Sequence, residues 1–228
     1  MLESFTSDEI LFGKLKLLQP ENFARVNMDT ILLSAWVKVR SGHNKFLEAG
    51  CASGAISLLL AMKFNRLKIT GIDIQNELIE LAKLNAENNN LDDRVNFIEG
   101  DLRDKNILPR EYFDGLVINP PYSSLSSSRQ GCNISRSTAR LELTCNIDDV
   151  ADLAQRVLKS KGRMFAVFKS ERLDVFLSSM LAKKIVPKKI RSVYSKINSN
   201  SEIFLIECVK DGGENLTLLP PLIVRDEN

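Results

Sequence analysis

Residues 45–62 form a predicted strand, a glycine-bearing turn and a helix in direct succession, and this unit restricts the possible folds more than any other part of the chain. Residues 45–49 are short and mostly apolar, as in a strand buried in a sheet. Gly50 and Gly54 then allow a tight turn, and the apolar residues that follow recur with a helical period. Because a strand that turns directly into a helix begins a βαβ unit, we predict an α/β fold with a parallel sheet.

Polar or glycine-rich turns also end the next two predicted strands. The apolar run 67–72 is followed by Asp73, about twenty residues after the glycine turn, and the run 95–98 is followed by Glu99-Gly100-Asp101-Leu102. Because the carboxyl ends of parallel strands lie along one edge of a sheet, we expect a ligand there. The Asp73 carboxylate can accept hydrogen bonds from both hydroxyls of a ribose, and Asp101 can accept one from an adenine amine.

The glycine turn has the pattern Glu48-x-Gly50-x-x-x-Gly54, in which Ala52 replaces the middle glycine of the G-x-G-x-x-G sequence of dinucleotide enzymes. A pyrophosphate pressed against the turn would require that glycine. A ligand without phosphates, such as S-adenosylmethionine, tolerates a small side chain there. Glu48 adds negative charge near the expected place of a sulfonium or ammonium group. An ordinary α/β turn without a ligand is the alternative interpretation.

The sequence Asn119-Pro120-Pro121-Tyr122 follows the apolar run 113–118 and suits the binding of a planar amino group. Asn119 offers an amide oxygen as an acceptor, and the two prolines fix a rigid, extended exit that can turn the Pro120 carbonyl toward a cavity. Two acceptors would hold an amine whose lone pair is delocalised, and Tyr122 can stack on the planar group. The alternative is an ordinary Pro-Pro turn with a packed tyrosine.

The remaining pattern predicts one α/β domain, residues 45–228, preceded by a short N-terminal extension, residues 1–44. In the extension we predict a strand-turn segment at 11–18 and a helix from Asp29 to Val37. Asp29 is placed to cap that helix, or alternatively to reach the cofactor or brace the 119–122 turn. Helices are also predicted at 76–88, 147–158 and 173–181, and strands at 162–168, 190–194 and 203–209.

Two stretches carry positive charge that suits an RNA partner. The serine-rich segment 123–146 has neither helical nor strand period and directly follows the 119–122 turn, so we expect a substrate loop, with a mobile insertion without a role as the alternative. Between residues 156 and 196, twelve basic residues are opposed only by Glu171 and Asp174. A phosphate backbone would be attracted to this stretch, and a solvated surface is the alternative interpretation.

Composition excludes several other classes of protein. No apolar run approaches the roughly twenty residues of a membrane span, and no charged-then-apolar leader opens the sequence, so we expect a cytoplasmic protein without a membrane partner. The four cysteines form no C-x-x-C pair and His43 is the only histidine. We therefore expect free thiols, no disulfide framework and no metal site. A monomer or a weak dimer is expected.

The order of the motifs gives the chain a family resemblance. The motifs are Glu48–Gly54, Gly71–Ile74, Glu99–Leu102 and Asn119–Tyr122. In this order they resemble the class I S-adenosylmethionine-dependent methyltransferases that act on amino nitrogens. The chain is more closely similar to the bacterial adenine-specific tRNA methyltransferases that modify the adenine next to the anticodon of a valine tRNA. Further matches to that family are residues 6–8, 12–20, 27–33 and 170–173.

This resemblance implies a Rossmann-like sheet of seven strands in the order 3-2-1-4-5-7-6 with strand 7 antiparallel, S-adenosylmethionine as the cofactor and tRNA as the partner. The implied catalytic residues are Asn119, Pro120, Pro121 and Tyr122. The implied cofactor-binding residues are Glu48, Ala49, Gly50, Cys51, Gly54, Asp73, Ile74, Asp101, Leu102 and Asn119. The residues expected to contact RNA are Arg129, Arg136, Arg140, Lys169, Arg172, Lys184, Lys188, Lys189 and Arg191.

The expected activity is methyl transfer from S-adenosylmethionine to the exocyclic amine of an adenine in tRNA, with the anticodon-adjacent adenine as the target. Glutamine methyltransferases of release factors use the same tetrapeptide, but they generally carry a larger helical N-terminal domain than residues 1–45 allow. A sequence-specific DNA adenine methyltransferase would need a target-recognition domain for which the chain has no room. From another class, a non-catalytic RNA-binding module would keep the basic stretch and lose the pocket residues.

Overall fold

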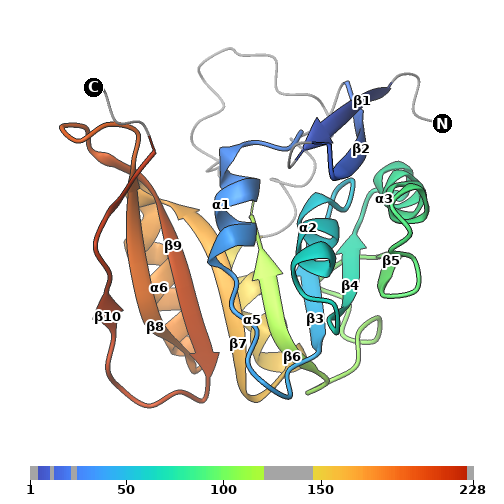
Figure 1. Cartoon of the computed structure of the whole chain (residues 1–228). Coiled ribbons are helices and arrows are strands. Elements are labelled where there is room, and N and C mark those ends of the chain that lie inside the picture. Colours follow the sequence, from blue (N-terminus) through green and yellow to red (C-terminus); the bar gives the residue numbers. More distant parts are fainter. Residues whose placement is uncertain (1–4, 11–12, 22–24, 121–145, 225–228) are drawn as a thin grey trace, which may run out of the picture.

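A computed structural model describes residues 5–10, 13–21, 25–120 and 146–224, and it shows a central β-sheet with helices packed on both faces (Figure 1). Some of the residues discussed above lie outside the described part of the chain. They are Pro121, Tyr122 and residues 123–145 of the predicted substrate loop, which include Arg129, Arg136, Arg140 and two of the four cysteines, Cys132 and Cys145.

The central sheet contains nine strands within the described residues. They are β3 (Lys45–Ala49), β4 (Lys68–Asp73), β5 (Val95–Glu99), β6 (Phe113–Ile118), β7 (Leu158–Lys169), β8 (Ile185–Tyr194), β9 (Ser201–Lys210), β10 (Thr217–Leu218) and β11 (Leu222–Ile223). Their order is β10-β8-β9-β7-β6-β3-β4-β5, and β11 also pairs with β8.

The predicted Rossmann-like α/β fold is confirmed. When β3 to β9 are numbered 1 to 7, their order across the sheet is 3-2-1-4-5-7-6, and β9 is antiparallel to both neighbours. The predicted number of seven strands is too low, because the chain after Lys210 returns along β8 and adds the two short parallel strands β10 and β11.

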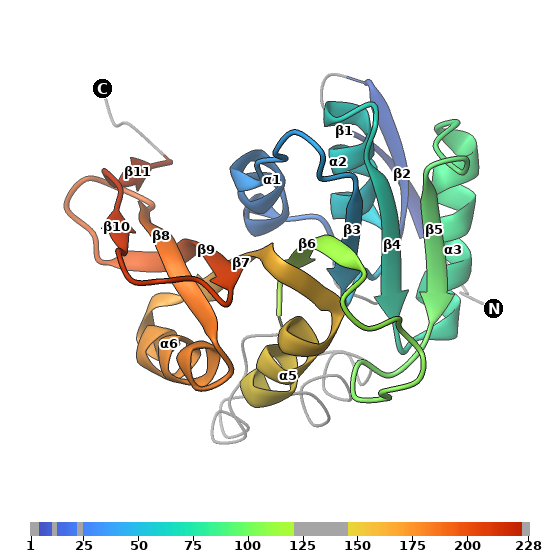
Figure 2. The same ribbon diagram turned by 90° about the horizontal axis from the view of Figure 1, so that it is seen from below.

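Two groups of helices cover the two faces of the sheet (Figure 2). One group is α1 (Met28–Trp36), α2 (Ala55–Lys63) and α3 (Asn76–Asn88), and the other is α5 (Ile147–Val157) and α6 (Leu173–Ala182), which follows the short 3₁₀ turn Ser170–Arg172. Strand β6 is buried along its whole length. Val117 belongs to the apolar cluster under the first group, and Leu116 and Ile118 belong to the cluster under the second. Because successive residues of a strand face opposite sides, burial on both faces requires an apolar run such as this one.

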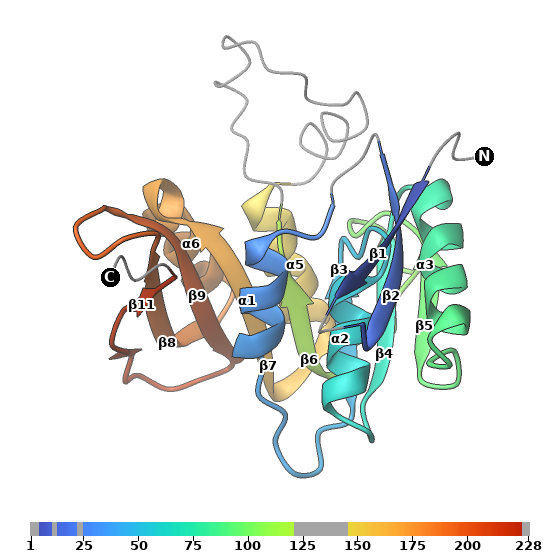
Figure 3. The same cartoon turned by 45° about the horizontal axis from the view of Figure 1, so that its top comes forward.

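The N-terminal residues form a hairpin of β1 (Phe5–Ile10) and β2 (Leu15–Pro20) that lies beside α3 (Figure 3). Two asparagines one turn apart on α3 bond the free edge of β2. Asn89 bonds the amide and carbonyl of Lys16, and Asn85 bonds those of Leu18. The predicted strand-turn segment at 11–18 is wrong in position, because the polar residues of β1 hide the first strand and the turn falls between the two.

Helix α1 is capped by Asn27, so the prediction that Asp29 is the cap is wrong. Asn27 has extended backbone angles, and its Oδ1 accepts a hydrogen bond of 3.1 Å from the amide of Thr30. Asp29 is the second residue of the helix, where its negative charge interacts favourably with the positive end of the helix dipole.

The structure also bears on the predictions about cysteines, membrane spans and metal sites. Cys51 and Cys208 are buried free thiols, as predicted for them. In the described ranges, no helix is both long and apolar enough to cross a membrane. Within the same ranges, no group of three or more histidine, cysteine, aspartate or glutamate residues is arranged to hold a metal ion.

Candidate active site

The carboxyl ends of four parallel strands meet along one edge of the sheet. Strand β3 lies between β4 and β6, and β5 follows β4. The register pairs Ala49 with both Ile72 and Ile118, and Asp73 with Glu99. The glycine turn after β3, Asp73 and the start of the 119–122 turn therefore lie next to one another, although up to seventy residues separate them in sequence.

The glycine turn is held against β4 by backbone hydrogen bonds. The amides of Gly50 and Cys51 both donate to the Ile72 carbonyl, at 2.8 and 3.1 Å. Gly50 is exposed with φ +69°, and no atom lies within 4 Å of the place where a Cβ would stand. Gly54, with φ +84°, is the N-cap residue just before α2, and a Cβ there would lie 2.5 Å from Cζ of Phe97. Gly50 thus leaves open space for close approach of a ligand, whereas the absence of a side chain at Gly54 leaves space for the buried ring of Phe97.

The two glycines should respond differently to alanine. Gly54→Ala combines left-handed strain with overlap against Phe97, so we expect the free energy of unfolding to fall by about 2–4 kcal/mol. Gly50→Ala carries only the strain, about 1 kcal/mol, but it fills the open space and should weaken cofactor binding about tenfold or more. Urea unfolding and calorimetric titration with S-adenosylhomocysteine measure the two effects. Equal losses of stability in both variants would contradict this assignment.

Glu48 is a buried carboxyl group at the end of β3, with 2% of its surface exposed. Its Oε2 accepts hydrogen bonds from both the amide and the hydroxyl of Ser57, with the amide at 2.8 Å. Burial raises the pKa of Glu48 to about 8. Glu48 therefore binds the first turn of α2, and its expected contact with the cofactor stays a prediction.

This buried carboxyl group predicts a pH dependence of stability. Since the pKa of Glu48 is about 8 in the folded chain against an ordinary value of 4.5, folding favours the protonated form. The contribution of Glu48 to the free energy of unfolding is complete below pH about 4.5 and is lost as the pH rises through 8. The free energy of unfolding falls by at most about 1.4 kcal/mol per pH unit in this range. Urea unfolding of Glu48→Gln between pH 5 and 8 should therefore show a weaker decline than the unsubstituted chain. The exposed Glu77→Gln is the control, and a parallel decline in all three proteins would contradict the prediction.

Asp73 ends β4 with 2% of its surface exposed. Its Oδ2 accepts from the Ala52 amide at 2.9 Å, and its Oδ1 accepts from the Gln75 amide at 3.0 Å. Burial raises the pKa of this carboxyl group. Hydrogen bonds from the Gln75 side chain and the Ile74 backbone also stabilise the charged form. The expected ribose hydroxyls must therefore share the carboxylate oxygens with these donors. Ile74 follows with 41% exposure, an apolar surface at the same edge that suits an adenine ring.

Asp101 is already bound to a neighbouring residue. Arg103 donates to both carboxylate oxygens, the closest contact being 2.6 Å, and its amide donates to Oδ1 at 2.9 Å. These hydrogen bonds lower the pKa of Asp101. The expected contact of Asp101 with an adenine amine must therefore share these oxygens with Arg103. Leu102 packs against the apolar cluster under α5 and α6.

Asn119 and Pro120 follow β6 at the same edge. Asn119 is half-buried and Pro120 is buried. Because Ala49 pairs with Ile118, Asn119 lies directly beside the position of Gly50 in the register. The acceptors of the predicted amine site thus begin next to the open space at the glycine turn. Pro121 and Tyr122 lie outside the described residues.

The residues expected to contact RNA fall into two groups. Lys169 ends β7 and Arg172 lies in the following turn, at the edge that carries Asn119. Lys184 instead precedes β8 at its amino end, and Lys188 and Lys189 lie within that strand. Lys188 donates to the carbonyls of Gly213 and Glu214, and Lys189 lies 3.6 Å from Glu207.

The other predicted RNA contact in β8 is packed on the first group of helices. The guanidinium carbon of Arg191 lies 5.8 Å from the ring centre of Trp36 in α1. The structure thus brings Lys169 and Arg172 to the edge that carries Asn119, and it places Lys184 at the opposite edge and Lys188 and Lys189 within β8. Arg191 is level with Asn119 in the register, but β7 and β9 lie between β8 and β6.

Sequence reasoning missed two residues that support the site. Ser57 holds Glu48, and its signal was a hydroxyl at the third helical position after the glycine turn. Asn85 is fully buried and donates to the Ser53 carbonyl at 3.0 Å, which joins α3 to the glycine turn. A buried asparagine on the apolar face of a predicted helix was its only signal.

A Rossmann-like sheet of this order, with a glycine turn, a buried aspartate and an asparagine at its carboxyl edge, defines a class I S-adenosylmethionine-dependent methyltransferase. A family model described as "Methyltransferase domain" matches residues 40–201, and the chain belongs to this family. The chain is therefore a methyltransferase domain, the class of protein whose methyl donor is S-adenosylmethionine. The open space at Gly50, the carboxylate of Asp73 at the end of β4 and the exposed Ile74 fit this cofactor.

Curated relatives include two kinds of methyltransferase. The chain is 30% identical over 155 residues to the tRNA1(Val) (adenine(37)-N6)-methyltransferase of Porphyromonas gingivalis, a match that covers 65% of this chain and 60% of the relative. It is 34% identical over 104 residues to the release factor glutamine methyltransferase of Dictyoglomus turgidum, with 46% of this chain and 34% of the relative covered. The match thus spans about 60% of the length of the first relative.

Solved structures share the fold. A predicted O-methyltransferase from Agrobacterium tumefaciens superposes with a TM-score of 0.69 at 18% identity, covering 86% of this chain and 87% of the other. A geranyl diphosphate methyltransferase in complex with SAM gives a TM-score of 0.58 at 14% identity, covering 79% of this chain and 84% of the other.

Proposed function

We propose that this enzyme methylates the exocyclic amine of an adenine in tRNA, the adenine beside the anticodon. The observation that carries the proposal is the position of Asn119, which follows β6 directly beside the glycine turn that follows β3. An acceptor for an amine thus stands next to the space that suits the methyl donor. Similarity to a tRNA adenine methyltransferase supports adenine as the substrate.

The chain's own residues position the amine. The amide oxygen of Asn119 and the carbonyl of Pro120 offer two acceptors for its two hydrogens. Both hydrogens lie in the plane of the amine, so the nitrogen lone pair stays available to attack the methyl group. S-adenosylmethionine supplies a methyl group that its positively charged sulfur already activates. Holding the two reacting groups in line therefore provides most of the rate enhancement that the protein must supply.

An adenine in an anticodon loop must leave its base stack to reach this edge. Tyr122 is proposed to stack on it, and Lys169 and Arg172 to contact nearby phosphates, because both basic residues lie at the same edge. With such a substrate we also propose a cytoplasmic location and a monomer or weak dimer.

A glutamine side chain of a release factor is the second candidate substrate. Its amide nitrogen has the same delocalised lone pair and the same two hydrogens as the adenine amine. The local identity of 34% to a release factor glutamine methyltransferase favours this candidate. The larger aligned share of the tRNA methyltransferase, 60% against 34%, favours the adenine.

Labelled S-adenosylmethionine distinguishes the two substrates. The purified chain is incubated with unmodified tRNA and, separately, with release factors, and label in each is counted. We expect label in the tRNA at an N6-methyladenosine that nuclease digestion and mass spectrometry identify. Label in release factors alone would reject the RNA substrate and support the second candidate.

A further inference from the structure

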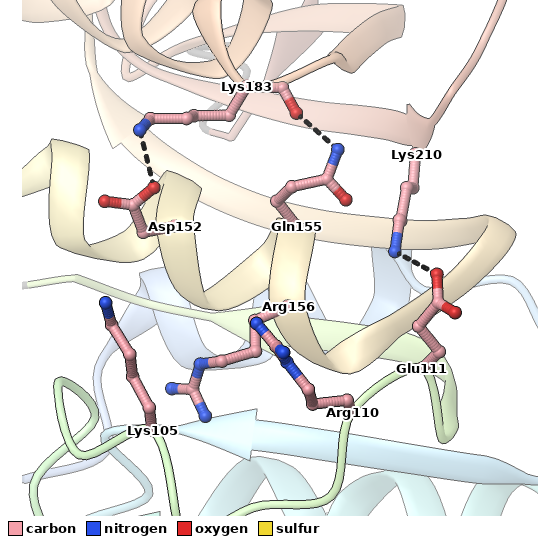
Figure 4. Close-up of a pocket in the computed structure, with 8 residues that line it drawn as sticks. All are labelled: Lys105, Arg110, Glu111, Asp152, Gln155, Arg156, Lys183 and Lys210. Carbon is pink, nitrogen blue, oxygen red and sulfur yellow. Dashed lines mark hydrogen bonds and ion pairs between the residues drawn. The ribbon is translucent and has the colours of Figure 1, made fainter.

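A second, strongly basic pocket lies away from the methyltransferase site, on the sheet face covered by α5 and α6 (Figure 4). Its volume is about 650 Å³. The loop between β5 and β6 forms one wall, and the last turn of α5 and the ends of α6 and β9 form the others. Five basic and two acidic side chains line it.

Two of the five basic residues are neutralised by the two acids. Lys183 lies 2.7 Å from Asp152, and Lys210 lies 2.9 Å from Glu111. Figure 4 shows both ion pairs as dashed lines, and no such line reaches Lys105, Arg110 or Arg156. These three residues carry the net positive charge of the pocket.

The three remaining cations have no carboxylate partner within salt-bridge distance among the described residues. Lys105 and Arg110 are exposed. Arg156 is half-buried, with Nη2 donating to the Leu102 carbonyl at 2.8 Å. Its Nη1 is buried and has no hydrogen-bond partner in the described part of the chain. Burial and the nearby charge of Arg110 lower the pKa of Arg156, and the charges of Asp104 and Asp152 offset only part of this effect. Like charges held together in this way are stabilised when an anion binds between them.

We propose that Lys105, Arg110 and Arg156 form a binding site for a phosphate group. Guanidinium groups bind phosphate oxygens through paired hydrogen bonds, and a lysine adds a mobile charge. The nonbridging oxygens of a phosphate group, in a backbone diester or in a monoester, point in tetrahedral directions, so two arginines and a lysine can contact them from different sides, whereas the two oxygens of a carboxylate lie in one plane. The exposure of Lys105 and Arg110 gives the ligand access from solvent.

The phosphate belongs to an RNA backbone or to a free phosphate ester. The pocket lies near the amino end of β6, since Arg110 and Glu111 directly precede that strand, whereas Asn119 follows its carboxyl end. A strand of this length spans about 20 Å. An RNA stem that extends from the target base along the α5 and α6 face would cover that distance. The phosphate site stands independently, but its assignment to the RNA backbone rests on the proposed function.

The first test uses inorganic phosphate and the whole chain. Thermal unfolding is followed in phosphate and in sodium chloride of equal ionic strength. We expect phosphate to raise the Tm of the unsubstituted chain and to have little effect on the double variant Lys105→Gln/Arg110→Gln. Both side chains are exposed, so the variant keeps the core. Arg66→Gln, an exposed arginine of the α2–β4 loop outside the pocket, should keep the full phosphate effect.

The second test identifies the source of the phosphate. tRNA affinity is measured from 50 to 300 mM salt for the same three proteins. An RNA source predicts that the double variant binds about five- to tenfold more weakly and that its salt dependence falls by about one to two phosphate contacts. A phosphate effect on Tm with unchanged tRNA binding assigns the site to a free phosphate ester.

Failure of this inference and failure of the proposed function give different results. If phosphate stabilises all three proteins equally and tRNA binding is unchanged in the double variant, the phosphate site is rejected, whether or not tRNA is methylated. If the double variant alone loses the phosphate effect and the unsubstituted chain methylates no RNA, the phosphate site is supported and the proposed function is rejected.

Discussion

Asn119→Ala is expected to lower the rate of methyl transfer by about 10²–10³-fold while S-adenosylhomocysteine binding changes by less than about threefold. The substitution removes an acceptor that would hold the amine and leaves the backbone of the turn in place. Asn119 follows β6 and is not part of the glycine turn, so the expected cofactor contacts at Gly50 and Asp73 should be retained. Single-turnover transfer and calorimetric titration measure the two quantities.

A matched control for Asn119 is Asn198, an exposed asparagine in the loop between β8 and β9 at the same edge of the sheet. Asn198→Ala should transfer methyl groups at the rate of the unsubstituted chain. If Asn119→Ala keeps full transfer activity, the amine is held elsewhere. If it loses cofactor binding to the same extent as activity, Asn119 supports the cofactor and the proposed role in holding the amine is wrong.

Asp73→Ala is expected to weaken cofactor binding by about 10²-fold or more. Two hydrogen bonds from ribose hydroxyls to a charged acceptor are worth about 1.5–3 kcal/mol each. The substitution also frees the amide of Ala52 in the glycine turn and the amide of Gln75. Methyl transfer at saturating S-adenosylmethionine should recover more than transfer at low concentration, because the loss lies in binding.

The control for Asp73 is Asp92→Ala, which removes an exposed carboxylate from the loop before β5 and should leave cofactor affinity unchanged. Urea unfolding of Asp73→Ala separates loss of binding from loss of the fold. An Asp73→Ala variant that is folded and binds the cofactor normally would place the ribose contact at another residue.

The fold could be predicted from the sequence where apolar runs end in turns. The helix predicted at 76–88 coincides with α3, Asn76–Asn88. Strand β8 begins at Ile185, earlier than the predicted 190, because Pro187 and the following lysines interrupt its apolar pattern. Lys188 is tolerated in the strand because it donates to carbonyls of the returning chain after β9. That contact joins residues distant in sequence, so no local pattern indicates it.

The candidate site could be predicted only in part. Motif spacing indicates which residues stand at the edge of the sheet, because strand ends determine the edge. It does not indicate which of their atoms are already bound by the protein. The Glu48 carboxyl group is held by Ser57, and the Asp101 carboxylate is held by Arg103. Both partners are near in sequence, but serine and arginine at those positions have many other possible uses.

The asparagines that hold the N-terminal hairpin also set an order of assembly during synthesis. The hairpin leaves the ribosome before α3, because its partners Asn85 and Asn89 follow 67 and 73 residues behind Leu18 and Lys16. Asn85 also bonds the Ser53 carbonyl in the glycine turn. Until α3 has emerged, the hairpin has no place to dock and the turn lacks this support. The nascent chain is therefore expected to become competent for cofactor binding only after Asn89 has been translated and cleared the exit tunnel.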